Sequence, residues 1–186
     1  MTFGLPSNVR STYYSRRAVG PDTMNDYTDA LAAMLLEEEE LQFRAFTNDI
    51  ALRLGLLFAD IAGREGKSIT IDIARNGQML FHCALHGTSA DNDVWIERKK
   101  RVVDHYGHSS FYIGTLYASQ GVTFEQKSRL DPGRYAAAGG CFPVIVRYVG
   151  PVGTVSVSGL PQAEDHALVV RVLRQFLADG GDRSAD

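Results

Sequence analysis

The sequence predicts an α+β domain in which a mainly antiparallel sheet is covered by helices. Apolar residues repeat with a helical period before, between and after two pairs of strand-like segments. No internal repeat is present, and strands do not alternate with helices as they do in a doubly wound parallel sheet. The connection between the two strand pairs is long enough to cross over, so a mixed sheet stays open. The length of 186 residues suits one domain.

Composition describes a globular protein and excludes several classes. Hydrophobic residues make up 45% of the chain, charged residues 22%, and the formal net charge is −3. A nucleic-acid-binding protein would show a clustered basic face, which this balance argues against. No apolar run approaches the roughly 20 residues of a membrane span, and no signal-peptide layout opens the chain. A cytoplasmic protein with no nucleic-acid or membrane partner is therefore expected, with Cys83 and Cys141 as reduced core residues.

The chain divides into three parts by composition. Residues 1–23 are rich in Ser, Thr, Tyr and Arg and lack an amphipathic period. We expect them to form a flexible N-terminal extension, although an arm ordered by a partner subunit is the alternative. Periodicity begins just after Met24, so the domain is expected to span 24–178. A frayed C-terminal tail is expected over 179–186.

The first half of the domain predicts two helices and a hairpin. A helical repeat runs from Tyr27 to Leu41, and its acidic end, 37–40, is expected to be solvated rather than to bind a metal. Thr47 can cap the second helix. An apolar stripe marks this helix, and two glycines end it: Ile50, Leu54, Leu57, Phe58, Ile61, then Gly63 and Gly66. Two alternating segments then predict strands over Ser68–Ala74 and Gln78–Leu85, joined by a tight Asn76-Gly77 turn.

The second half predicts three helices and a second strand pair. One long helix runs from about Asp91 to Tyr106, where Gly107 ends it, and Ser109 or Ser110 then caps a shorter helix through Ala118. After an irregular stretch around Asp131-Pro132-Gly133, strands are expected over Phe142–Val149 and Thr154–Ser158, separated by Gly150-Pro151. Pro161 opens the final helix.

Familiar catalytic and metal-binding motifs are not found. His82 and His86 lie about 13 Å apart along one predicted strand, which is too far to share a metal ion. No H-x-x-x-H or Cys/His cluster occurs, so no metal site is expected. A single histidine could still serve as an axial haem ligand. Gly139-Gly140 is not a phosphate loop, but a glycine pair before a buried strand indicates close backbone approach.

Two ionisable residues fall where amphipathic helices place apolar side chains. Lys99 lies at the centre of the apolar stripe of its helix with Asn92 nearly above it, and His166 lies in the stripe of the last helix. Burial of a lysine is costly without partners, and buried ionisable groups gather at functional sites. One hypothesis places Lys99, Asn92, His166 and Gly139-Gly140 in a pocket at the sheet edge. In the other, Lys99 pairs structurally with Asp165 or a strand-end carbonyl, and His166 is a satisfied core histidine.

Two strings in the sequence resemble a known family. Residues 87–99, GTSADNDVWIERK, and residues 157–166, VSGLPQAEDH, are similar to the haem-degrading domain superfamily, the GlcG/HbpS-like proteins. The resemblance covers about 24–178 and implies a profilin- or PAS-like α/β/α sandwich, a natural start near Met24, and a homo-oligomer, often a ring. The resemblance assigns no residue of this chain as a haem ligand. The family positions that it transfers are Asn92, Trp95, Lys99, Gly139, Gly140, Asp165 and His166.

The leading functional hypothesis is an oligomeric, cytosolic accessory protein that binds haem or another small ligand. Its pocket would lie between the helix of Trp95 and Lys99 and the helix start at Asp165 and His166. A cationic Lys99 beside the positive end of the last helix suits an anion such as a carboxylate or a haem propionate. A non-catalytic scaffold module is one alternative. An enzyme that uses Lys99 and His166 as a proton-transfer pair is the other.

Overall fold

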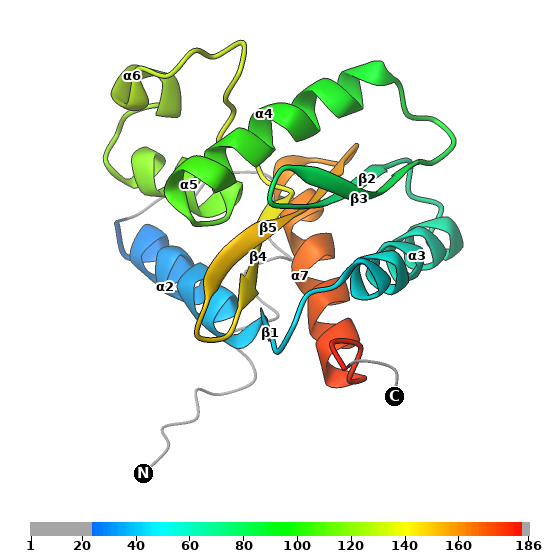
Figure 1. Cartoon of the computed structure of the whole chain (residues 1–186). Coiled ribbons are helices and arrows are strands. Elements are labelled where there is room, and N and C mark those ends of the chain that lie inside the picture. Colours follow the sequence, from blue (N-terminus) through cyan, green and yellow to red (C-terminus); the bar gives the residue numbers. More distant parts are fainter. Residues whose placement is uncertain (1–23, 184–186) are drawn as a thin grey trace.

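A computed structural model describes residues 24–183, so the extension expected over 1–23 lies outside the described residues. A five-stranded sheet forms the middle layer, with helix α4 on one face and helices α3 and α7 on the other (Figure 1). The expected α/β/α sandwich is therefore confirmed. Within the described range, no helix is long and apolar enough to cross a membrane.

The sheet is mixed but mainly antiparallel. Its spatial order is β1-β4-β5-β2-β3, and only the β1–β4 pair is parallel. The strands are β1 (Gln42–Phe43), β2 (Thr70–Arg75), β3 (Gln78–Ala84), β4 (Cys141–Val146) and β5 (Gly150–Ser158). Strand β1 was not predicted, because two residues are too few to show an alternating pattern.

The helices within residues 24–183 follow the predicted periods, except for α6. They are α2 (Met24–Glu40), α3 (Asn48–Arg64), α4 (Ala90–Tyr106), α5 (Ser110–Ser119), α6 (Phe124–Ser128) and α7 (Gln162–Ala178). The hydroxyl of Thr47 caps α3 by accepting the Ile50 N–H, and Ser109 caps α5. Helix α6 lies in the stretch expected to be irregular, because five residues are too short for a recognisable helical stripe.

One hairpin forms as predicted and the other is displaced. Asn76 and Gly77 both have positive φ, 49° and 80°, as a type I′ turn requires. In the second hairpin the turn comprises residues 147–149, and Gly150-Pro151 begins β5 instead of separating the strands. Tyr148 takes the left-handed conformation there with φ of 64°. The Gly-Pro pair was misleading because proline is tolerated near the start of a strand.

The two faces of the sheet differ in polarity, and this difference positions the site. The face toward α3 and α7 carries the apolar core, with Ile71, Ile73, Phe142, Val144, Val155 and Val157. The alternate residues of β2 and β5 face α4, and most are buried polar side chains: Thr70, Asp72, Thr154, Ser156 and Ser158. We call this set the polar layer. Helix α4 thus packs on hydroxyls and a carboxylate as well as on apolar groups.

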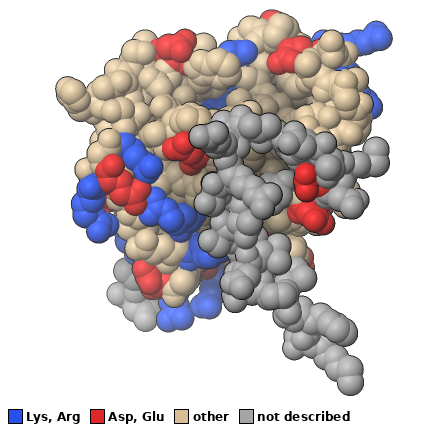
Figure 2. Space-filling view, turned by 180° about the vertical axis from the view of Figure 1, so that it is seen from behind, with Lys and Arg blue, Asp and Glu red and all other residues tan. Residues whose placement is uncertain are grey.

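One prediction about the end of α2 is wrong. Glu37 and Glu38 are buried rather than solvated, because they contact His166 on α7 and His108 just before α5. Beyond α7, Asp182 is 6% exposed and accepts the Arg44 N–H. On the face shown in Figure 2, basic and acidic side chains are interspersed where described residues are visible.

Candidate functional site

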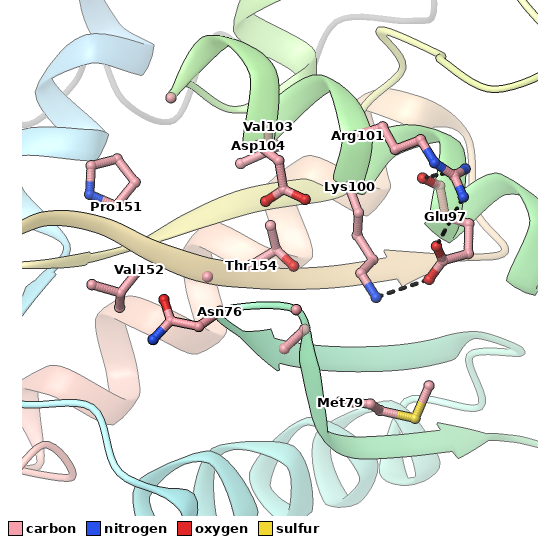
Figure 3. Close-up of a pocket in the computed structure, with 14 residues that line it drawn as sticks. Asn76, Met79, Glu97, Lys100, Arg101, Val103, Asp104, Pro151, Val152 and Thr154 are labelled. Carbon is pink, nitrogen blue, oxygen red and sulfur yellow. Dashed lines mark hydrogen bonds and ion pairs between the residues drawn. The ribbon is translucent and has the colours of Figure 1, made fainter.

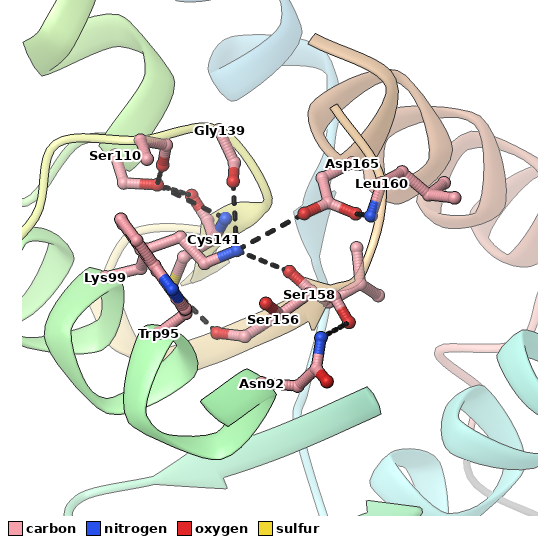
Figure 4. Close-up of polar contacts among 12 residues, drawn as sticks. Asn92, Trp95, Lys99, Ser110, Gly139, Cys141, Ser156, Ser158, Leu160 and Asp165 are labelled. Atoms are coloured by element: carbon pink, nitrogen blue, oxygen red, sulfur yellow. Dashed lines mark hydrogen bonds and ion pairs between the residues drawn. The ribbon is translucent and has the colours of Figure 1, made fainter. Parts of the chain in front are cut away.

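A cavity of about 440 Å³ lies where the N-terminal half of α4 meets the end of β5 and the start of α7. We call it the α4–α7 cavity. Its lining includes five of the predicted site residues, Asn92, Trp95, Lys99, Gly139 and Asp165, together with Asp91, Ala138, Ser158, Gly159, Leu160 and Gln162. Figure 4 shows Lys99 from α4, Ser158 from β5 and Asp165 from α7 converging there. The pocket therefore lies between the two helices that the sequence pointed to.

Lys99 forms the floor of the cavity and has no spare donor. Its side chain is 1% exposed, as the helical stripe predicted. Nζ donates to the carbonyl oxygens of Gly139 at 3.0 Å and Val157 at 2.6 Å, and lies 3.5 Å from the Asp165 carboxylate. An ammonium has three donors, so these contacts use all of them. The structural interpretation of Lys99 agrees with these contacts, and a ligand could bind Nζ only by displacing one partner.

Burial shifts the ionisation of both members of the pair. Desolvation lowers the pKa of Lys99, and the nearby Asp165 carboxylate opposes that shift. Desolvation raises the pKa of Asp165 to about 6, against the opposing effect of Lys99. Asp165 also accepts the Leu160 N–H, which fixes the carboxylate at the start of α7. The pair is close to neutral overall, so Lys99 brings little net positive charge to the cavity.

The two glycines permit close approach of the chain around Lys99. A Cβ on Gly139 would overlap the carbonyl group of Gln162. Gly140 has φ of 105°, and a Cβ there would lie 2.8 Å from Lys99 Nζ. The close approach predicted for the pair is therefore present. Gly140 itself is not among the lining residues, because it lies behind the ammonium and bonds β5 through its carbonyl to the Val157 N–H.

Asn92 ties α4 to the end of β5. Its Oδ1 accepts the Ser89 N–H in a capping box, and Nδ2 donates to the Ser158 carbonyl at 3.1 Å. The amide has a second N–H on Nδ2 that these contacts leave available. Asn92 is thus held in a fixed orientation at the wall of the cavity, with one donor for a ligand.

Trp95 lines the cavity, and Arg98 packs on its indole ring. The indole is 37% exposed, donates through Nε1 to Asp91, and carries the Arg98 guanidinium 4.3 Å from its ring centroid. Within residues 24–183, Arg98 has no ion pair, and its buried Nε has no hydrogen-bond partner. On the helical wheel Arg98 lies off the centre of the apolar stripe, a position that predicts a solvated or subunit-contacting charge. The i,i+3 spacing from Trp95 is the signal that could have found it.

His166 is not part of the cavity. Its side chain is fully buried, Nε2 lies 3.2 Å from a Glu37 carboxylate oxygen, and the ring packs beside Phe111 at a centroid distance of 4.9 Å. Consecutive helical residues point about 100° apart, so Asp165 faces the cavity while His166 faces α2. Lys99 and His166 therefore do not share one pocket, which corrects that part of the prediction.

Cys141, at the start of β4, lies near Lys99 and contacts Ser156 of the polar layer. Its thiol is fully buried and accepts a hydrogen bond from the Ser156 hydroxyl at 2.9 Å, and burial raises its pKa to about 12. A thiol with so high a pKa stays protonated and unreactive. The expectation of a reduced core residue is met by Cys141, whereas Cys83 is partly exposed on β3.

A family model described as "Haem degrading protein HbpS-like" matches residues 46–174. A UPF0303 protein from Streptomyces coelicolor is 54% identical over 146 residues, which is 77% of this chain and 92% of that protein. The family-model match over residues 46–174 therefore includes the segments that build the α4–α7 cavity.

Solved structures support the same fold. The crystal structure titled Ybr137w protein superposes with a TM-score of 0.75 at 31% identity, covering 83% of this chain and 94% of that one. A structure titled PduOC:Heme Complex superposes with a TM-score of 0.59 at 13% identity, covering 70% of this chain and 94% of that one. At that identity the second likeness concerns the fold alone.

Proposed function

The chain belongs to the HbpS-like family of haem-degrading proteins, and on that premise we propose that it is an accessory protein that binds a planar organic anion. The ligand enters the α4–α7 cavity and stacks on Trp95. The observation that carries this proposal is the Trp95–Arg98 stack: an aromatic side chain that lines the cavity, with a guanidinium on its ring that forms no ion pair among residues 24–183.

The aromatic wall selects a flat ligand. Trp95 is large and rigid, and its hydrogen bond to Asp91 limits rotation of the ring. The floor offers no free charge, because Lys99 and Asp165 satisfy one another. A flat ring on the indole face opposite Arg98 would therefore gain contact area without disturbing the Lys99–Asp165 pair.

The charge beside Trp95 selects an anion. Arg98 supplies the cation that the sequence had assigned to Lys99, and its planar fork suits a carboxylate. The first turn of α7, which begins at Gln162, has no side-chain cap, and negative charge is favoured at this end of a helix. The second N–H of Asn92 supplies one further donor.

Haem fits this cavity only in part. No histidine, cysteine, methionine or tyrosine side chain is among the residues that line it, so the iron would have no protein ligand there. The carboxylate-bearing edge of a porphyrin does match an aromatic face beside Arg98. The residues thus favour recognition of propionates and ring over recognition of the metal.

We also propose that the protein is a cytoplasmic homo-oligomer, the arrangement that the family resemblance implies. The β4–β5 turn supports this proposal, because Tyr148 is fully exposed and Val149 is 71% exposed. Exposed apolar side chains clustered at a turn are typical of contact surfaces. A scaffold without a ligand is the rival function, and the separation of Lys99 from His166 disfavours the enzyme alternative.

Binding is tested with haem, iron-free protoporphyrin and the transparent planar dianion isophthalate. Trp95 is the single tryptophan of the chain, so its emission reports isophthalate at the cavity directly. We expect haem and protoporphyrin to bind with comparable affinity. Trp95→Ala and Arg98→Met should each weaken binding by about tenfold or more, since stacking and charge-assisted contacts are each worth roughly 1–3 kcal/mol.

Arg64→Met is the matched control, because Arg64 is an exposed arginine paired with Asp60 on α3, away from the cavity. It should leave the affinities unchanged. A haem complex that is far tighter than the protoporphyrin complex and survives both the Trp95 and the Arg98 variant would place binding elsewhere. Failure of all three probes to bind would favour the scaffold.

A further inference from the structure

A second cavity lies at the opposite end of α4. It has a volume of about 760 Å³ and is formed by the C-terminal half of α4, the Asn76-Gly77 turn and the start of β5 (Figure 3). We call it the α4–hairpin cavity. It shares no lining residue with the α4–α7 cavity, so a ligand here would be independent of the proposed function.

The cations that line this cavity are already paired. Lys100 Nζ lies 2.9 Å from Asp72 and 2.9 Å from Glu97, and Arg101 pairs with Glu97 at 3.5 Å. Burial opposes the charge on Lys100, but these two carboxylates outweigh it and raise its pKa. The basic side chains therefore act to hold α4 on the polar layer and leave little attraction for an anion.

Two acceptors in the cavity form no hydrogen bond or ion pair among residues 24–183. One is Asp104, an exposed carboxylate whose pKa is raised by desolvation while nearby Lys100 and Arg101 oppose that shift. Thr154, a member of the polar layer, is 1% exposed, and its Oγ1 has no hydrogen-bond partner. Figure 3 shows the Thr154 hydroxyl and the Asp104 carboxylate facing the same space from β5 and α4. A buried hydroxyl without a partner is destabilising, so its presence calls for a ligand or another role.

Part of the wall is apolar. Val103, Pro151 and Val152 line one side, and Met79 from the edge strand lines the other. A ligand would therefore bury a nonpolar body while its polar head meets the two acceptors.

We propose that the α4–hairpin cavity binds a small organic cation, an ammonium group on a compact apolar body. The ammonium pairs with Asp104 and donates to Thr154, and the body packs on Val103 and Val152. Asp104 is the appropriate partner because, among the described residues, it is the lining carboxylate that forms no ion pair, whereas Glu97 is paired twice.

Saturation-transfer NMR with benzylammonium as the probe tests the proposal, with benzyl alcohol and benzoate as charge controls. Asp104→Asn should weaken benzylammonium binding at least tenfold, because a contact to a charged group is lost. Thr154→Val should weaken binding severalfold and raise the melting temperature, since it removes the unsatisfied hydroxyl without a change of shape. Benzoate should show no competition at this cavity.

Two variants distinguish binding at this cavity from binding elsewhere on the protein. Arg98→Met should leave benzylammonium binding unchanged, so failure here is distinguishable from failure at the α4–α7 cavity. Asp60→Asn is the control for a surface carboxylate, because Asp60 is exposed and its partner is Arg64. Equal binding to the Asp104→Asn variant, or a lower melting temperature for Thr154→Val, would overturn the proposal.

Discussion

At the scale of single residues, Lys99 and Asp165 carry opposite charges into a layer that water hardly reaches. Each depends on the other, because removal of one partner leaves an uncompensated buried charge. The contacts to Gly139 and Val157 extend this dependence to the loop before β4 and to the end of β5. The pair therefore fixes the position of α4 above the sheet.

Replacement of Lys99 should be strongly destabilising. Lys99→Met removes the cation and leaves the Asp165 carboxylate buried, which costs about 3–5 kcal/mol. Urea unfolding at a fixed protein concentration measures the loss. Lys67→Met is the control, since the partly exposed Lys67–Glu65 pair contributes less than about 1 kcal/mol. A Lys99→Met/Asp165→Leu double variant should recover part of the stability, and equal losses in single and double variants would contradict this account.

The Lys99–Asp165 pair also predicts how the free energy of unfolding depends on pH. The pKa of Asp165 is raised from 3.8 to about 6 in the folded state. A carboxyl with a raised folded pKa contributes most to stability below pH 4, and that contribution is lost as pH rises through 6. Without Lys99 the pKa rises further, so Lys99→Met should lose less stability at pH 5 than at pH 8. Unfolding curves at both pH values check this, and a loss independent of pH would count against it.

At this scale the sequence predicted the burial of Lys99 and, as one of two hypotheses, its pairing with Asp165 or a strand-end carbonyl. The helical stripe placed Lys99 and His166 inside, since burial follows from 100° steps along one helix. The sequence could not choose between the two hypotheses, because the acceptors of Lys99 lie 40 and 58 residues away along the chain. Arg98 was missed because its significance comes from the Trp95 ring below it, not from its charge alone.

At the scale of elements, α4 is supported by a sheet face that is unusually polar. Its two ends close two different cavities, and its middle is anchored through Lys99 and Lys100. Strong periods predicted α3, α4 and α7, and the Asn-Gly turn predicted the first hairpin. Strand β1 and helix α6 were missed because elements of two and five residues carry no period.

Helix α2 is docked through adjacent carboxylates. Glu38 accepts the Ser109 N–H at 2.7 Å and contacts His108 at 2.6 Å, while Glu37 reaches His166. Glu38→Ala leaves a buried N–H unsatisfied, so a loss of about 1–3 kcal/mol is expected, with faster hydrogen exchange over 24–40. Glu39→Ala, at the exposed neighbour, should change neither. Similar exchange in both variants would show that packing alone holds α2.

At the scale of the whole molecule, the proposed homo-oligomer needs a contact surface. Tyr148→Ser with Val149→Ser removes the apolar tip of the β4–β5 turn without touching the core. We expect a smaller subunit number in native mass spectrometry and an unchanged circular dichroism spectrum. Leu56→Ser, at a 55% exposed position on α3, is the comparison. Dissociation by Leu56→Ser but not by the turn variant would move the interface to α3.

The central claim is that the α4–α7 cavity holds a small planar ligand. Native mass spectrometry of the full chain, before and after incubation with haem and with protoporphyrin, reports retained ligand and subunit number together. The account predicts added ligand mass on the wild-type protein that Trp95→Ala and Arg98→Met lose while the subunit number stays the same. Ligand mass retained equally by both variants, or absent from the wild-type protein with every probe, would contradict it.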